Sequence, residues 1–292
     1  MPEIRRAARR STRIITPLRQ LATQLLLILV AIFVLIPIWG MLRIALDGAI
    51  KSVPTQFNLL PAQPTLAVFE KVWHTPSQTL SFLGLLKNSL LVSGASALAA
   101  VIMGASMAYA FARFRFRGRE PGLIAILVGA FLPLVALMTP LYILLEIINL
   151  RSSLVGLILV YTAFALPFCI WNMRAAFQSI PLEMEEAALL DGASPLGTFL
   201  RITLPNALPA IGVAALLAFL TAYSEFAIGW LFVENSQNVT LAMALWGILT
   251  MGSYPWSQLA AMAILTSLPV VVIFLALQHN LFDRMIFGGL SQ

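Results

Sequence analysis

The chain has 292 residues, of which 60% are hydrophobic and 10% are charged, and its mean hydropathy is +0.92. Soluble domains carry about 25% charged residues, so the composition excludes an ordinary soluble domain and predicts an integral membrane protein. The formal net charge of +6 could suggest nucleic acid as a partner, but membrane topology accounts for the arginines. The single cysteine, Cys169, excludes a disulfide framework and is expected to be a buried small residue.

Six charge-free stretches predict six membrane-spanning helices in an all-α fold. A bilayer core about 30 Å thick requires about 20 apolar residues in a helix. The stretches are residues 20–42, 88–112, 121–145, 152–173, 202–224 and 235–282. In the last of these we expect the helix to begin near Trp256. Prolines are expected to interrupt helices three to five at Pro133, Pro140, Pro167 and Pro209.

The distribution of basic residues predicts the orientation of these helices. With the N-terminus inside, 13 of the 18 lysines and arginines fall on the cytoplasmic side, as the positive-inside rule requires. They are Arg5, Arg6, Arg9, Arg10, Arg13, Arg19, Arg113, Arg115, Arg117, Arg119, Arg174, Arg201 and Arg284. Both termini are therefore expected in the cytoplasm, on the same side as the loops at 113–120 and 178–206.

This topology divides the chain into regions. We expect a cytoplasmic basic N-terminus at residues 1–19, a first transmembrane helix at 20–43 and an extracytoplasmic segment at 44–84. A core of five transmembrane helices follows at 85–284, includes the cytoplasmic loop 178–206, and leads into a cytoplasmic tail at 285–292. Prolines and large apolar residues alternate in the extracytoplasmic segment, so we expect it to pack on the membrane surface or on a partner.

The cytoplasmic loop is predicted to form two short helices joined by a glycine. Pro181 suits the first position of the first helix, where its missing N–H costs nothing. Gly192 suits the left-handed conformation that ends such a helix. A Ser-Pro pair at 194–195 can begin the second helix, which Pro205 would end. Near the start of the first helix, three carboxylates interact favourably with the helix dipole: Glu183, Glu185 and Glu186.

Two interpretations of this acidic loop are open: it could lie on the inner leaflet or enter a groove on another protein. The surface of the inner leaflet is anionic and attracts basic segments, so the acidic residues favour the second interpretation. Within the loop, Glu186-Ala187-Ala188, Gly192 and Ile202-x-Leu204-Pro205 have a specific spacing. This spacing resembles the loop that type I ABC importer permeases present to their ATPase.

The resemblance covers roughly residues 55–285 and is nearest to the carbohydrate-uptake branch, the maltose-type second permease. Further short patterns support it by their order and spacing. They are Asn88-Ser89-Leu90, Arg113-Phe114-Arg115-Phe116-Arg117-Gly118, Pro140-Leu141-Tyr142, Leu166-Pro167-Phe168 and Ser179-Ile180-Pro181. The resemblance implies a subunit of a binding-protein-dependent sugar importer, with an oligosaccharide as the expected substrate, in the bacterial cytoplasmic (inner) membrane.

In that family the loop is a coupling helix seated in a cleft of the ATPase subunit. The resemblance carries this role to Glu186, Ala187 and Gly192, with Glu185, Ala188 and Asp191 as neighbours in the same contact. A carboxylate at position 186 would accept charge-assisted hydrogen bonds from a basic cleft. The implied partners are a second permease in a heterodimer, two ATPase subunits and an extracytoplasmic solute-binding protein.

The chain has no phosphate-binding loop of its own. Its three lysines are Lys51, Lys71 and Lys87, and none follows a glycine. No Ser-His-Asp or paired-carboxylate arrangement falls on one side of the predicted membrane. We therefore expect a transport subunit rather than an enzyme, with no cofactor of its own and with ATP and Mg²⁺ bound by the separate ATPase subunits.

Candidate residues of the translocation pathway are Tyr223, Ser224 and Glu225. Here the chain departs from the family, which usually has Trp-Asn-Glu-Phe where this chain has Tyr223-Ser224-Glu225-Phe226. Glu225 is an acidic residue deep in an apolar stretch, and such a residue normally faces a cavity or a partner. A structural partner in the paired permease is as open an interpretation as a substrate or gate role. The tail also departs from the family, because it lacks the usual glycine-and-lysine ending.

Three other functions compete with a sugar permease. An ABC permease for another solute, such as glycerol phosphate, an amino acid or a polyamine, would share the same loop. A secondary transporter driven by an ion gradient would need ionisable residues within the membrane, and Glu225 alone supports it. An intramembrane enzyme is disfavoured by the missing catalytic arrangement.

Overall fold

The computed structural model describes residues 17–56, 58–76, 79–251 and 255–288. All regular secondary structure in these ranges is helical, apart from one isolated bridge between Asp47 and Pro64. The predicted all-α class is therefore confirmed for the described residues. Most of the basic N-terminus (1–16) and the end of the tail (289–292) lie outside them.

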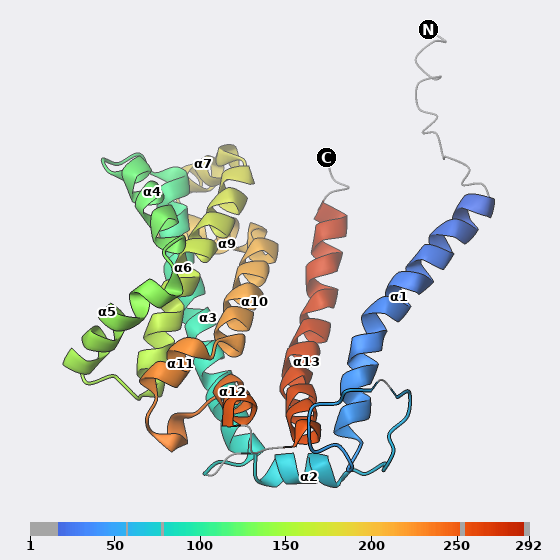
Figure 1. The fold of residues 1–292 in the computed structure, drawn as a ribbon. Coiled ribbons are helices and arrows are strands. Elements are labelled where there is room, and N and C mark those ends of the chain that lie inside the picture. Colours follow the sequence, from blue (N-terminus) through green and yellow to red (C-terminus); the bar gives the residue numbers. More distant parts are fainter. Residues whose placement is uncertain (1–16, 57, 77–78, 252–254, 289–292) are drawn as a thin grey trace.

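The helices follow one another with short connections through most of the chain (Figure 1). In order they are α1 (Pro17–Ala45), α2 (Ala67–His74), α3 (Phe82–Arg113), α4 (Arg119–Ala130), α5 (Leu134–Ile147), α6 (Leu154–Ser179), α7 (Leu182–Leu190), α8 (Pro195–Thr198), the π-helical turn η2 (Phe199–Thr203), α9 (Leu204–Asn206), α10 (Leu208–Ser224), α11 (Ala227–Phe232), the 3₁₀ turn η3 (Ser236–Asn238), α12 (Leu241–Met251) and α13 (Trp256–Gly288).

Four helices are long and apolar enough to cross a membrane alone: α1, α3, α6 and α13. Two further spans exist if each of two bent pairs crosses as one unit. The pair α4 and α5 bends by 100°, and the unit Pro195–Asn206 bends by 76° against α10. The described helices are therefore compatible with six spans, while the count and the orientation in the membrane stay predictions.

The two bends between helices coincide only partly with the prolines at which the sequence predicted interruptions. Pro133 precedes α5 at the first break, as expected, but Pro140 and Pro167 lie inside α5 and α6, which continue through them. The second break falls at Ala207, between α9 and α10, and Pro209 is in the first turn of α10. Neighbouring helices can satisfy the carbonyl that a proline leaves free, so a proline need not end a membrane helix.

The core is formed by α3, α6 and α10, which pack on one another. Small side chains line their contact, including Ala100, Ala108 and Ala214, each with no exposed surface. A Cβ added at Gly104 would lie 2.9 Å from the Cβ of Cys169 and from the Cε of Met173, so the glycine allows α3 to approach α6 closely. Cys169 is fully buried, as the sequence predicted.

The segment after α1 is fixed by one buried carboxylate. Asp47 accepts hydrogen bonds from the backbone N–H groups of Ala49 (3.1 Å), Ala62 (2.8 Å) and Gln63 (3.1 Å) and lies 3.5 Å from Arg43. Burial raises the pKa of Asp47, but these hydrogen bonds and the arginine outweigh it and hold the pKa below its ordinary value. Ala62 and Gln63 are therefore held against the end of α1.

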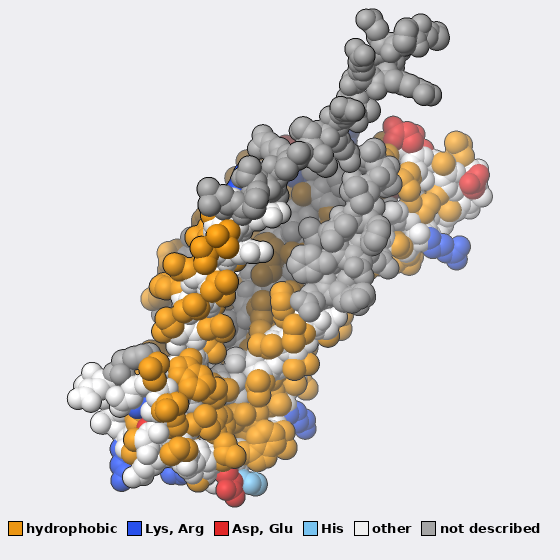
Figure 2. All heavy atoms as spheres, turned by 90° about the vertical axis from the view of Figure 1, so that its right-hand side faces the viewer, with side chains coloured by type: hydrophobic (Ala, Val, Ile, Leu, Met, Phe, Trp, Pro, Cys, Tyr) orange, Lys and Arg blue, Asp and Glu red, His pale blue; other side chains and the backbone are white. Residues whose placement is uncertain are grey.

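The apolar surface of α1 is almost entirely exposed. Figure 2 shows hydrophobic side chains along this face of the molecule, with charged side chains gathered toward its two ends. Trp39 of α1 donates from Nε1 to the carbonyl of Leu59 (2.9 Å), which holds the segment around Leu59 beside the helix. The side chains of Leu59 (69% exposed) and Leu60 (72% exposed) therefore extend the exposed apolar surface of α1. In a membrane such a surface contacts lipid or another subunit.

The two ends of the molecule carry different elements. The start of α1, the end of α13 and α7 lie toward one end, and α2 and α12 lie toward the other (Figure 1). Among the described residues, α7 of the loop 178–206 therefore lies toward the same end as the start of α1 and the end of α13.

Candidate functional site

The loop at 178–206 contains two helical pieces joined at a glycine, as the sequence predicted. Gly192 has a φ of +85°, in the left-handed region, and separates α7 from α8. Ser194 caps α8, because its hydroxyl accepts the N–H of Gly197 (3.1 Å), and Pro195 follows as the first helical residue. The start of α8 is thus capped locally, whereas α7 begins after Pro181 without a side-chain cap.

Two details of the loop differ from the prediction. Pro181 stands just before α7 in an extended conformation, with ψ of 133°, so that Leu182 is the first helical residue. Pro205 lies inside α9 rather than after it, and the helical path ends at Asn206. A proline in the first turn of a new helical segment loses no hydrogen bond, and the π-helical turn η2 directly before α9 provides such a restart.

The helix α7 has one buried face. Glu185 is 4% exposed and Ala188 is 8% exposed. The Glu185 carboxylate accepts from the Nε of Arg113 (2.9 Å), the hydroxyl of Thr203 (2.8 Å) and the hydroxyl of Tyr109 (3.1 Å). These residues come from α3 and η2, so the buried face of α7 is tied to its own helix bundle.

The opposite face of α7 is exposed. Glu186, Ala187, Asp191 and Gly192 all lie on the surface, and Leu190 is 88% exposed. We call these five residues the outer face of the loop. The predicted contact residues thus fall into two groups, because Glu185 and Ala188 point inward and the other four point outward. An exposed leucine beside a carboxylate and a glycine is a surface that a groove on another protein could cover.

The candidate pathway residues differ in their surroundings: Tyr223 is buried, whereas Ser224 is exposed. Tyr223 is 5% exposed, stacks on Phe219 and donates its hydroxyl proton to the carbonyl of Thr266 (2.9 Å). Its side chain therefore joins α10 to α13 and is not on a free surface. Ser224 is exposed and borders a cavity of about 400 Å³ that is otherwise apolar. The cavity wall comes from α1, α12, α13 and the link between α10 and α11, and it includes Met41, Phe226, Trp246 and Trp256.

Glu225 has a structural partner within its own chain. It follows the last residue of α10, and its carboxyl group accepts the N–H groups of Ile228 (2.9 Å) and Gly229 (3.4 Å) at the start of α11. The hydroxyl of Tyr161, from α6, donates to the same group at 2.6 Å. These partners lie within this chain and not in a paired permease, and the carboxyl group caps a short helix where the main chain turns.

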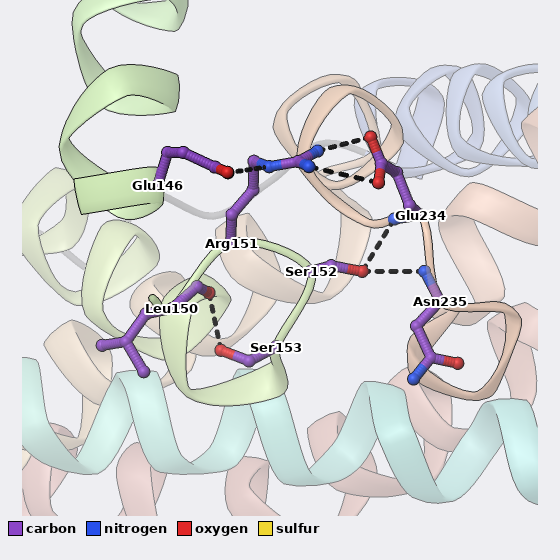
Figure 3. Close-up of polar contacts among 7 residues, drawn as sticks. All are labelled: Glu146, Leu150, Arg151, Ser152, Ser153, Glu234 and Asn235. Carbon is purple, nitrogen blue, oxygen red and sulfur yellow. Dashed lines mark hydrogen bonds and ion pairs between the residues drawn. The ribbon is translucent and has the colours of Figure 1, made fainter. Parts of the chain in front are cut away.

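Sequence reasoning missed a polar cluster at the opposite end from α7. The segment after α11, residues 233–240, is called the outer strap. Figure 3 shows Arg151 between Glu146 and Glu234, hydrogen-bonded to both. Ser152, with a φ of +59°, accepts the N–H groups of Glu234 (2.8 Å) and Asn235 (2.7 Å) at one hydroxyl oxygen.

The outer strap is held from its other side by α3. Asn88 donates from Nδ2 to the carbonyls of Gln237 (2.8 Å) and Val239 (2.9 Å). The hydroxyl of Ser89 accepts the N–H of Leu241, at 2.7 Å, where α12 begins. The Asn-Ser pair was noted in the sequence as a family pattern, but its partners lie about 150 positions away along the chain. No local signal could have identified them.

Comparison with known proteins identifies the family. Residues 100–287 match the family described as the binding-protein-dependent transport system inner membrane component, and the chain belongs to this family. It is 32% identical over 210 residues to the maltose/maltodextrin transport system permease protein MalG of Escherichia coli (strain K12), covering 70% of this chain and 71% of that protein. The chain is thus a multi-pass subunit of a transport system in the bacterial inner membrane.

Another relative matches over a greater length. The sulfoquinovosyl glycerol transport system permease protein SmoH of Agrobacterium fabrum is 28% identical over 275 residues, with 94% of each chain covered. Among solved structures, a bacterial ABC transporter involved in import of the acidic polysaccharide alginate is similar with a TM-score of 0.71 and 21% identity, covering 89% of this chain and 95% of that chain. This likeness supports the fold.

Proposed function

We propose that the chain is a membrane-spanning permease subunit of an ATP-driven importer that takes up a sugar, most simply an oligosaccharide. The outer face of the coupling loop carries this proposal. Its exposed residues have the spacing of a family loop, and a buried anchor at Glu185 holds them in place. The relatives named for maltose, maltodextrin and sulfoquinovosyl glycerol transport support a carbohydrate substrate.

The proposed complex contains a second permease, two ATPase subunits that bind ATP and Mg²⁺, and an extracytoplasmic solute-binding protein. ATP-driven closure of the ATPase subunits displaces the coupling loop, and the helices change from inward-facing to outward-facing. Nucleotide must bind the closed arrangement more tightly than the open one, because a ligand shifts a two-state equilibrium only by its difference in affinity. The solute-binding protein then delivers the sugar to the outward-facing state.

The sugar's path is proposed to run along the cavity bordered by Ser224. Its stacked pair, Phe226 and Trp246, has ring centroids 4.5 Å apart, and Trp256 lines the same cavity. Aromatic faces suit the apolar faces of pyranose rings. Polar partners for the hydroxyl groups would come from the second permease, since this wall offers few of its own.

The ion-coupled alternative loses its support in this structure. Glu225 was the residue that favoured it, and its carboxyl group is already engaged by Tyr161 and two backbone N–H groups. A coupling residue must bind and release its ion during each cycle. The carboxyl group of Glu225 is poorly suited to this, because its oxygens already accept the hydrogen bonds that cap α11. An ABC permease for a non-sugar solute keeps the same architecture and differs only in the ligand of the solute-binding protein.

The outer face is tested by substitution. Glu186→Arg turns a positive charge toward the basic cleft expected on the ATPase subunit. Gly192→Val forces a β-branched residue into a φ of +85°, at a cost of about 1–3 kcal/mol. We expect both variants to weaken copurification of the ATPase subunit and to lower uptake. Gly192→Asn is the matched control, because Asn tolerates this conformation. If both disruptive variants keep normal subunit stoichiometry and transport, the proposed role of the loop is wrong.

A further inference from the structure

The buried carboxylate of Glu185 faces away from the surface on which an ATPase would dock. Three side chains from two other elements converge on it: Arg113 at the end of α3, Tyr109 one turn earlier, and Thr203 at the end of η2. The Nη2 of Arg113 also approaches the Oε1 of Glu185 to 2.8 Å. The carboxylate is therefore fully engaged inside the chain.

Arg113 holds the coupling loop at a second point. Its Nη2 donates to the carbonyl of Ile180 (2.9 Å), the first of the two residues between α6 and α7. One guanidinium group is thus hydrogen-bonded both to Ile180, just before α7, and to Glu185 on the buried face of α7. Because the group is planar with several fixed donors, it defines the angle of α7 relative to α3 as well as the distance.

The surroundings of this pair are apolar and aromatic. The ring of Tyr109 lies 4.6 Å from that of Phe199 and 6.0 Å from that of Phe177, measured between centroids. The side chains of Arg113 and Glu185 are 11% and 5% exposed. In such a site a charge that loses its partner is strongly disfavoured, so the two groups stay together when the loop is pushed.

The other end of α3 is attached just as firmly. Asn88 and Ser89 hold the outer strap and the start of α12 through the hydrogen bonds described above. About 24 residues separate Ser89 from Arg113, which corresponds to roughly 36 Å of continuous helix at 1.5 Å per residue. The helix α3, from Phe82 to Arg113, contains no proline. A proline kink therefore does not absorb a displacement along it.

We propose that Arg113 and Glu185 form the joint that transmits movement of the coupling loop to α3, and through α3 to the outer strap. Both are positioning residues: they act through the loop and do not contact the ATPase or the sugar. The inference deepens the proposed function and rests on it. It also reassigns Glu185, which the family resemblance placed beside the docking contact.

The joint is tested with Glu185→Gln, Arg113→Gln and the double variant in the assembled transporter. Each single variant leaves one buried charge without its partner and is expected to lower the melting temperature, whereas the double variant removes both charges together and recovers much of the loss. The matched control is Glu183→Gln, which makes the same change at an exposed position of α7. The decisive readout is sugar uptake per ATP hydrolysed.

We expect the double variant to bind the ATPase and hydrolyse ATP, because the outer face of the loop is intact. Its uptake per ATP should fall about tenfold or more, because the charge-assisted hydrogen bonds that join α7 and the loop entrance to α3 are gone. Hydrogen exchange of α7 amides in the permease should rise about tenfold in Glu185→Gln for the same reason. The control should change neither quantity.

Two results would overturn the joint. One is normal uptake per ATP in a stable double variant, which would reduce the pair to a structural role. The other is unchanged hydrogen exchange of α7 in all variants, which would show that the pair does not hold the loop. Failure of the proposed function looks different, because then the unaltered chain itself would bind no ATPase subunit.

Discussion

Glu225 stabilises the point where the helical path is interrupted between α10 and α11. The first N–H groups of any helix have no partner within that helix, and α11 begins near the middle of an apolar stretch where water is scarce. The carboxyl group of Glu225 accepts two of these N–H groups and the hydroxyl of Tyr161. A single side chain therefore satisfies the start of α11 and fixes it to α6.

The substitution Glu225→Gln tests this cap. It keeps the size of the side chain but replaces one acceptor oxygen with an NH₂ group that faces donors. We expect a loss of about 1–3 kcal/mol in stability, the usual effect of leaving a buried N–H group without its acceptor, seen as a lower melting temperature. Tyr161→Phe should cause a smaller decrease, and Glu120→Gln, at an exposed position of α4, should cause none. Unchanged melting and unchanged transport in Glu225→Gln would deny it both a structural and a pathway role.

The neighbours Glu185 and Glu186 show what the sequence could reveal at this scale. Successive residues of a helix point about 100° apart, so one buried and one exposed glutamate could be expected on α7. Which of them was buried could not be predicted, because the deciding partner, Arg113, lies 72 positions earlier. The motif identified the loop, and the tertiary contact assigned the roles.

At the level of elements, the outer strap is an irregular segment stabilised from two sides. Arg151 and Ser152 hold it from the turn before α6, and Asn88 holds it from α3. The hydrogen bonds from Arg151 hold the pKa of Glu234 below its ordinary value of 4.5. Because this pKa is lowered by folding, the contact stabilises the protein above pH 4.5 and is lost as the pH falls through the lowered value.

The pH dependence gives a test of the strap. Arg151→Gln should lower the melting temperature at pH 7, and the difference from the unaltered protein should shrink as the pH falls below about 4.5. High salt should reduce the difference too, since Glu234 is 68% exposed. Arg115→Gln, at an exposed arginine of the opposite end, serves as the control. A difference that is constant from pH 7 to pH 3 would contradict the assigned contact.

The sequence predicted the helices better than their breaks. Charge-free stretches located α1, α3, α6 and α13, because a span must be long and apolar wherever it packs. The break at Ala207 and the continuous path of α6 through Pro167 were not predicted. A proline only removes one hydrogen bond, and whether the helix bends there depends on the neighbours that replace it.

For the whole molecule, the exposed first helix is the feature that requires other subunits or lipid. None of the most apolar window of α1 is buried within the chain, and the helix packs mainly on α13. The cavity beside Ser224 is likewise open between α1, α12 and α13. Both features are consistent with one half of a permease pair, and the partner's identity lies beyond what one chain's sequence can specify.

The most direct test of the central claim is photo-crosslinking from the outer face of the coupling loop in a complex that is competent for uptake. A photoreactive amino acid at Leu190, 88% exposed, should crosslink to the ATPase subunit, whereas the same probe at Leu35, 57% exposed on α1, should not. Crosslinks from position 190 to lipid or to this chain alone would show that the energy for transport does not enter through this loop.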